Sequence, residues 1–180
     1  MANGKTLKNV RPRGAKNPVY DNIYLITKAE AERLFLSEEK ETKSIALAAE
    51  KMKEAGPLRP IVKGRAKVAE APSEQDWQQA AVYKIQIPAP DKAGVGASLL
   101  SISYRGDCAR LYANGRLIAD NFYYGRPFFY GLWRLPENCS QLELRILPLQ
   151  PDAPVYLPRE ADKTAGEQVY NVEIIQKKDI

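Results

Sequence analysis

The stretch Cys108-Ala-Arg-Leu-Tyr-Ala-Asn114-Gly115-Arg-Leu-Ile118 predicts two antiparallel strands joined by a tight turn. Asn-Gly between two such runs is the strongest short signal for a β-hairpin, because a type I′ turn needs a positive φ at both central residues. Glycine adopts that conformation without a steric penalty, and asparagine tolerates it. The turn requirement alone accounts for Asn114 and Gly115, so we expect a hairpin here rather than a ligand-binding loop.

The sequence around this hairpin alternates between apolar and polar residues with a period of two. In the run 81–87, Tyr83, Ile85 and Ile87 fall on one face. Comparable strand-like runs lie at 100–104, 127–135, 142–146, 155–157 and 169–175. Short strands with turn signals roughly every 8–12 residues are typical of an antiparallel sandwich. We therefore expect a mostly β fold, an antiparallel jelly roll or β-sandwich of about eight strands, over residues 76–180.

The N-terminal part predicts an irregular, partly helical extension. We divide it into a basic flexible tail over residues 1–16 and an extension with a connector over 17–75. The aromatic and β-branched residues of 17–26 predict a short strand. Thr27-Lys-Ala-Glu30 fits a capping box, which predicts a short helix that ends near Leu36.

Residues 38–55 also have a helix-forming composition, with Gly56-Pro57 as a stop signal. The spacing i, i+3, i+4, i+7 is followed by Ile45, Ala48, Ala49 and Met52. The apolar stripe is narrow, so strand pairing is the alternative for this segment. The proline-containing run 57–72 predicts an extended connector along a surface, and residues 73–76 cap a turn or two of helix around Trp77.

The charge of the protein is concentrated at its start. The 180 residues carry 27 basic and 22 acidic side chains, a formal net charge of +5, and no histidine. Five of the basic residues and no acid lie in residues 1–16, which leaves 22 of each sign elsewhere. A basic tail on an otherwise neutral protein is weak evidence for nucleic-acid binding, so we expect no nucleic-acid partner.

The sequence lacks the residues and segments that several kinds of site and protein require. Without histidine, neither a Ser-His-Asp triad nor a typical zinc site can form. No stretch approaches the roughly 20 apolar residues of a membrane span. The basic start is followed by no apolar segment of about 7–15 residues, so we expect no signal peptide in this chain.

The two cysteines could form a disulfide, and the loop acids could form a calcium site. Cys108 and Cys139 are expected as separate small hydrophobic residues, with a single disulfide as the alternative in an oxidising compartment. Four acids lie in or near loops and could bind structural calcium, although their spacing matches no calcium loop: Asp107, Asp120, Glu137 and Asp152. Loop acids usually bond local backbone, so we expect no cofactor.

Aromatic residues are concentrated between positions 122 and 133. Seven of the sixteen lie there: Phe122, Tyr123, Tyr124, Phe128, Phe129, Tyr130 and Trp133. Aromatic faces can stack on sugars while adjacent polar groups bond the hydroxyls, which gives a candidate carbohydrate site at Asp120, Asn121, Tyr123, Tyr124, Arg126 and Trp133. The alternative is that alternate aromatics fill the core and the others dock onto a neighbouring domain or a partner.

Three segments carry a resemblance to a known family. They are AEAPSEQDWQQAAVYK at 69–84, LSISYRGDCARLYANGRLIADNFYYGRP at 100–127 and LELRILPLQPDAPVYL at 142–157. In this order they resemble the C-terminal jelly-roll, galactose-binding-like region of bacterial β-galactosidases of glycoside hydrolase family 35. The resemblance covers roughly residues 69–175, while residues 1–45 match nothing we can place.

The resemblance implies an accessory role rather than catalysis. In those enzymes the chemistry belongs to a separate (β/α)8 barrel with paired carboxylates, and this chain has no room for a barrel of roughly 200 residues or more. It therefore implies a non-enzymatic accessory module that supports a catalytic domain or weakly binds a galactoside or plant-type polysaccharide. The parent glycosidase would be periplasmic or secreted. A protein-interaction module that docks partners, or itself, through the aromatic residues is the alternative.

Overall fold

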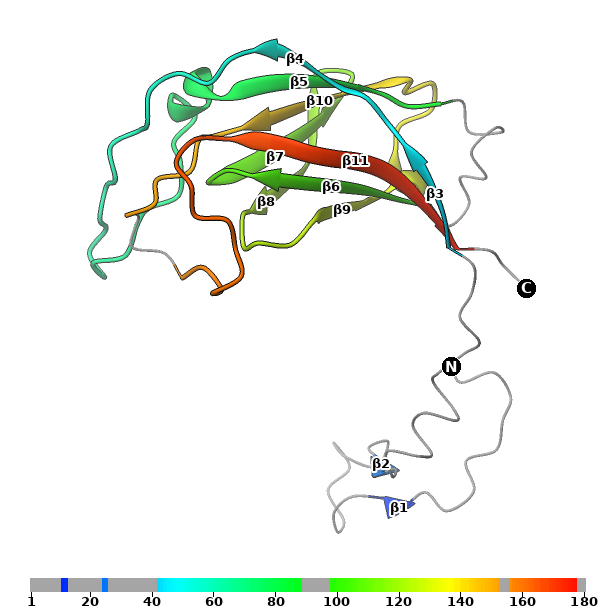
Figure 1. The fold of residues 1–180 in the computed structure, drawn as a ribbon, viewed down its shortest axis with the longest axis horizontal. Helices are drawn as coiled ribbons and strands as arrows, with labels where there is room; N and C mark the ends of the chain where they lie inside the picture. The colour runs from blue at the N-terminus through cyan, green and yellow to red at the C-terminus, as the bar shows by residue number, and fades with distance from the viewer. Residues whose placement is uncertain (1–10, 13–23, 26–41, 89–97, 153–155, 178–180) are drawn as a thin grey trace. The chain divides into compact units, whose positions relative to one another are not determined.

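A computed structural model of the chain describes residues 11–12, 24–25, 42–88, 98–152 and 156–177 (Figure 1). The chain divides into two compact units, Met1–Glu41 and Thr42–Ile180. In the first unit, β1 (Arg11–Pro12) pairs antiparallel with β2 (Tyr24–Leu25). The helix predicted over 27–36, and the basic tail apart from Arg11–Pro12, lie outside the described residues.

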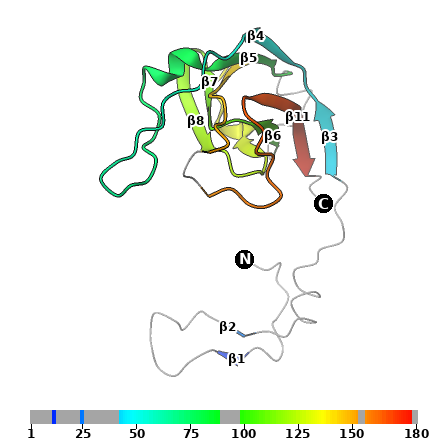
Figure 2. The same cartoon turned by 60° about the vertical axis from the view of Figure 1, so that its left-hand side comes forward.

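The second unit is built from two antiparallel sheets, which confirms the predicted β-sandwich (Figures 1 and 2). The five-stranded sheet has the order β4-β5-β10-β7-β8, and the four-stranded sheet the order β3-β11-β6-β9. Their bounds are β3 (Thr42–Ala46), β4 (Ala49–Lys53), β5 (Ala81–Gln86), β6 (Leu99–Arg105), β7 (Cys108–Ala113), β8 (Arg116–Phe122), β9 (Phe128–Gly131), β10 (Gln141–Ile146) and β11 (Gln168–Lys177). The described residues also contain two 3-10 helices, η2 (Asp76–Gln79) and η4 (Leu132–Arg134).

The apolar members of the alternating runs face the space between the sheets. Tyr83, Ile85 and Ile87 are all buried, as the period-two pattern predicts. On the neighbouring β10, the inward residues are fully buried, whereas the residues between them are half-buried or exposed. Burying one such aliphatic side chain stabilises the fold by about 1.5–3 kcal/mol, so the two inner faces hold the sandwich together.

The predicted hairpin forms between β7 and β8. Asn114 and Gly115 adopt φ values of 50° and 76°, and Ala113 pairs with Arg116 across the turn. Positive φ at both central residues is what a type I′ turn requires. A register shift between Leu111 and Tyr112 then marks a bulge in this pair of strands.

The helix predicted over 38–55 is wrong for residues 42–53, which form β3 and β4, while residues 38–41 lie outside the described part. β3 pairs with β11 and β4 pairs with β5, so one stretch extends both sheets on the same side (Figure 2). The short link 47–48 carries the chain from one sheet to the other, and the Leu47 amide donates to the Val172 carbonyl at 2.8 Å. Met52, part of the helical stripe, is 58% exposed. Strand pairing overrides the local helix preference because sheet edges gain backbone partners from it.

The second compact unit, Thr42–Ile180, includes the predicted boundary between residues 75 and 76. Two of the predicted strand runs have different bounds in the structure. The run 127–135 contains the strand β9 and then the helix η4. Residues 156–157 form no strand, and residue 155 lies outside the described part.

The connector 57–72 is tied to one end of the sandwich. Nε and Nη2 of Arg59 donate to one carboxylate oxygen of Asp107, at 3.2 and 3.1 Å. The Gln150 side chain also donates to the Arg59 carbonyl. Lys63 and Ala69 form an antiparallel bridge, so the segment folds back on itself rather than running straight.

The two cysteines lie in different surroundings. Cys108 is buried, Cys139 is partly exposed, and both are free thiols. Within the described part of the chain, no helix has both the length and the apolar character to cross a bilayer.

We expect Gly115→Ala to destabilise the protein by about 1–2 kcal/mol, because an L-residue is strained at a positive φ of 76°. No neighbouring atom lies within 4 Å of a Cβ added at this position. The loss of unfolding free energy therefore reports backbone strain alone, without a steric clash. Urea unfolding measures the change. Arg116→Ala, an exposed substitution at the next residue, serves as control and should change the unfolding free energy by less than about 0.5 kcal/mol.

Candidate functional site

The outer face of the five-stranded sheet carries a row of polar side chains on β7 and β10. Alternation along β7 points Arg110 and Tyr112 away from the core, since Ala109, Leu111 and Ala113 are fully buried. The same alternation on β10 points Gln141, Glu143 and Arg145 outward. Glu143 is the register partner of Tyr112, and Arg145 that of Arg110. We call this surface the outer face.

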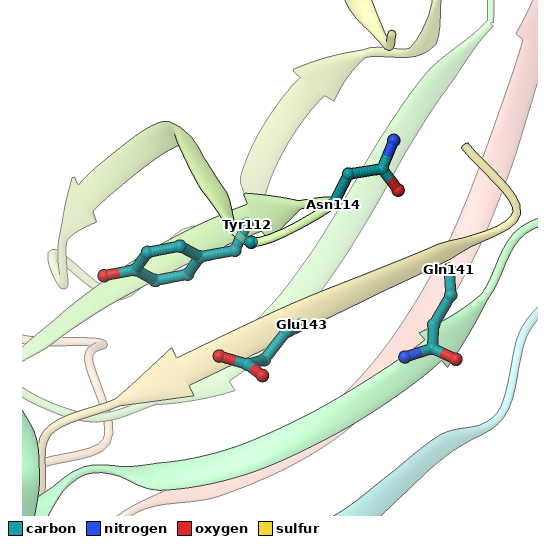
Figure 3. A pocket seen from close by; sticks show the side chains of 5 residues that line it. Tyr112, Asn114, Gln141 and Glu143 are labelled. Atoms are coloured by element: carbon teal, nitrogen blue, oxygen red, sulfur yellow. The ribbon is translucent and has the colours of Figure 1, made fainter. Parts of the chain in front are cut away.

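A hollow of about 280 Å³ lies at the hairpin end of the outer face (Figure 3). Its lining residues are Tyr112, Asn114, Gly115, Gln141 and Glu143, and we call it the Tyr112 hollow. Two of the side chains come from β10, one from β7 and one from the β7–β8 turn. Because three of the four stand on paired strands, their backbone positions are fixed before any ligand arrives.

Arg145 fixes the conformation of two of these side chains. Its Nε donates to a Glu143 carboxylate oxygen at 2.6 Å. Its guanidinium also lies 4.6 Å from the centroid of the Tyr112 ring, a cation–π distance. The ion pair is more than one-third exposed and adds little stability, but it holds the carboxylate beside the ring.

The chemistry of the Tyr112 hollow suits a neutral polar ligand. The amides of Asn114 and Gln141 each offer donors and an acceptor, and the Glu143 carboxylate accepts. The Tyr112 ring supplies an apolar surface, and Arg145 compensates the charge of Glu143. Ligand sites typically combine an apolar wall with a few placed polar groups, as this one does.

A smaller pocket, of about 70 Å³, lies at the opposite end of β7 and is called the Trp77 pocket. Its lining residues are Ala71, Pro72, Trp77, Cys108, Arg110, Asp120, Asn121 and Phe122. The Arg110 guanidinium lies 4.3 Å from the centroid of the Trp77 ring. Arg110 also donates to both carboxylate oxygens of Glu74, at 2.9 and 2.7 Å. The bond to Glu74 raises the pKa of Arg110, and the bond to Arg110 lowers the pKa of Glu74.

The structure divides the six residues predicted to bind carbohydrate. Asp120 and Asn121 line the Trp77 pocket. The Asn121 side-chain amide donates to the Tyr104 hydroxyl at 2.9 Å, and that hydroxyl donates to the Asn121 carbonyl at 3.2 Å. Tyr123 is 8% exposed and donates to the Asp162 carbonyl, so its hydroxyl has a structural partner.

The remaining three of the six are exposed. Tyr124 and Arg126 lie in the loop after β8, while Trp133 lies in η4, which follows the edge strand of the other sheet. The aromatic cluster therefore alternates as the core interpretation requires. Its buried members are Tyr123, Phe128 and Tyr130, and its exposed members are Phe122, Tyr124, Phe129 and Trp133.

Sequence reasoning missed the Tyr112 hollow. Tyr112, Gln141 and Glu143 lie at outward positions of runs that predict strands. The period-two pattern places each of them on the outer face, but it does not pair β7 with β10, which are separated by β8 and β9 along the chain. Only the pairing of β7 with β10 shows that these three side chains lie close together.

Two polar clusters elsewhere join segments of the sandwich. Lys51 bonds Glu167 at 2.9 Å and Glu54 at 3.0 Å, and Tyr83 also donates to Glu167. Burial, together with the bond to Glu167, raises the pKa of Tyr83 to about 12. In the second cluster, Arg105 donates to Asp162 at 2.7 Å.

The four loop acids considered for calcium are dispersed. Asp107 pairs with Arg59, and Asp120 lines the Trp77 pocket. Glu137 and Asp152 are exposed. The described residues contain no group of three or more His, Cys, Asp or Glu side chains arranged to hold a metal ion.

Comparison with known proteins adds no assignment, since neither a protein-family model nor a curated protein matches the chain.

Asp162→Asn tests the second polar cluster through its pH dependence. Hydrogen bonds from Thr164 and Tyr170 and the ion pair with Arg105 lower the pKa of Asp162 well below its usual range. A lowered pKa stabilises the fold above the ordinary aspartate pKa near 4, and this contribution is lost as the pH falls below it. We expect the variant to be destabilised at pH 7 and to approach the parent protein near pH 2.

Urea unfolding at both pH values measures this difference, with the exposed Asp152→Asn as the matched control. An Asp162→Asn destabilisation that is equal at the two pH values would contradict the role of its charge.

Proposed function

We propose that this protein is a carbohydrate-binding β-sandwich module of the accessory, non-catalytic kind found in β-galactosidases, and that it binds a galactoside in the Tyr112 hollow. The observation that carries the proposal is the composition of that hollow: one aromatic ring, two amides and one carboxylate on an ordered sheet face. The sequence resemblance of residues 69–175 supplies the sugar class.

Each lining group matches a different part of a sugar. Vicinal hydroxyls both donate and accept, so they pair with the Asn114 and Gln141 amides and with the carboxylate of Glu143. The apolar C–H surface of the ring suits the face of Tyr112. The volume, about 280 Å³, lies at the small end of ligand sites, which suits one sugar unit held weakly.

The electrostatics favour a neutral sugar over a charged one. Glu143 would repel an acidic sugar, and Arg145 already pairs with that carboxylate at 2.6 Å. Galactosides and neutral plant-type polysaccharides therefore fit better than uronic acid polymers.

A second candidate is docking through exposed aromatic side chains beside β9. Phe129 is 49% exposed and Trp133 56% exposed, and β9 is an edge strand that pairs only with β6 among the described strands. Exposed apolar surface beside an unpaired edge is typical of interaction sites. The partner would be a catalytic domain or a second copy of this chain.

A titration of the ¹⁵N-labelled protein with galactose, lactose and galactan oligosaccharides tests the sugar site. We expect the Gly115 and Gln141 amide resonances to shift with a dissociation constant in the millimolar range, about −4 kcal/mol. Glu143→Ala and Gln141→Ala should each weaken binding about fivefold, because each removes one hydrogen-bonding side chain.

Tyr124→Ala is the control for this titration, since Tyr124 is exposed but lies outside the Tyr112 hollow. Unchanged Gly115 and Gln141 resonances at high millimolar sugar would refute the proposed site. Loss of binding in Tyr124→Ala alone would favour the loop after β8 instead.

Sedimentation velocity over a range of concentrations tests the docking candidate. We expect concentration-dependent self-association, reduced in Phe129→Ser/Trp133→Ser because these changes remove exposed aromatic surface. Met52→Ser, also at an exposed apolar residue but on β4, is the control. A monomer at all concentrations would count against self-association, and would leave a separate catalytic domain as the partner to test by co-expression.

A further inference from the structure

The strand β9 forms a sheet edge that carries no charge. It pairs with β6 and with no other strand that the structure describes (Figure 1). The run 127–133, Pro-Phe-Phe-Tyr-Gly-Leu-Trp, contains no acidic or basic residue. Open sheet edges offer unpaired backbone groups to another strand, and proteins usually guard them with charges, bulges or short strands. Within β9 the only such guard is its length of four residues.

The other edges of the described sandwich are better protected. β3 carries the exposed Lys43. β4 holds three charged residues and has a bulge in its pairing with β5. β8 holds Arg116 and Asp120 and has a bulge in its pairing with β7. β9, in contrast, pairs with β6 in unbroken register. Among these four edges, β9 alone has neither a charge nor a bulge, so it is the one that can accept a further strand.

The backbone of Phe129 points toward the open side of β9. The Leu132 amide donates to the Ser98 carbonyl at 3.1 Å. Hydrogen-bonded pairs alternate along antiparallel strands, so Phe128 and Tyr130 also bond β6. The amide and the carbonyl of Phe129 therefore point away from β6, toward the side on which the structure describes no strand.

The side chain of Phe129 is open as well. It is 49% exposed, whereas the other residues of β9 are buried. A Cβ added at Gly131 would lie 2.5 Å from the Trp133 ring, so this ring lies against the Gly131 backbone. Residues two apart on a strand share a face, which places the Trp133 ring on the same face as Phe129. Phe129 thus offers one donor, one acceptor and one aromatic ring at the edge.

We propose that β9 pairs antiparallel with β9 of a second copy of this chain, about a two-fold axis at Phe129. This pairing joins the four-stranded sheets of the two copies into one continuous sheet. It rests on the docking candidate of the proposed function, and it names the partner and the residue at the centre of the contact.

A second copy supplies the matching edge by symmetry. Under the two-fold axis, each Phe129 amide donates to the Phe129 carbonyl of the other copy, as in a hydrogen-bonded pair of antiparallel strands. The two Phe129 rings then lie opposite each other, and aromatic cross-strand pairs are stabilising. Because the run 127–133 is uncharged, the axis brings no like charges of this run together. The strand is short, so we expect a weak, concentration-dependent dimer.

Sedimentation velocity of the full chain tests the pairing with variants of opposite charge. Phe129→Lys and Phe129→Glu should each weaken self-association about tenfold, because like charges then face each other across the axis. An equimolar mixture of the two variants should associate again, since lysine then faces glutamate. Leu117→Lys and Leu117→Glu, at a residue of similar exposure on the edge strand β8, are the matched controls and should associate like the parent protein.

Three results would overturn the pairing. They are a parent protein that stays monomeric at every concentration, a Phe129→Lys variant that associates like the parent, and a mixture that associates no better than its two components. The last result would mean that Phe129 does not face its own copy. None of them alters the galactose titration of the Gly115 and Gln141 resonances, so failure of the pairing is distinct from failure of the sugar site.

Discussion

The burial of two apolar sheet faces against each other determines where the other side chains of this protein lie. Leu100, Ile102, Leu144 and Ile174 are fully buried between the sheets, at inward positions of three different strands. Because side chains alternate along a strand, fixing the inner set also fixes the outer set. The polar outer face over β7 and β10 is therefore a consequence of the core, and its side chains are held in place by strands that cannot change register without exposing apolar residues.

The same constraint explains why β3 and β4 are strands. Their sequence favours a helix by spacing, but each strand covers a sheet edge that would otherwise leave backbone groups unpaired. Ile45 and Ala49 still pack against the core, from two different sheets. The same apolar residues can thus form one face of a helix or the buried positions of two short strands. Whether this segment is helix or strand depends on its distant pairing partners, β11 and β5.

The candidate sites follow from long-range pairing in a similar way. The residues predicted to bind carbohydrate are neighbours along the chain, from Asp120 to Trp133. In the fold, neighbours in this segment point to opposite sides, so Tyr123 enters the core while Phe122 and Tyr124 are exposed. The Tyr112 hollow instead joins residues up to 31 positions apart, Tyr112 and Glu143, which are register partners. The Trp77 pocket adds the connector and η2, which contact β7 and β8 only in the tertiary structure.

The amino-acid pattern predicts the β class, most of the strands, the turn at Asn114 and Gly115, and which residues of each strand share a face. These depend on local physics: the side-chain period of two and the left-handed backbone that Asn-Gly accepts. Which strands are neighbours, that residues 42–53 extend both sheets, and which outward side chains meet became clear only from the three-dimensional fold. Those outcomes depend on hydrogen bonds and packing between segments far apart in the chain, whose energies no local pattern contains.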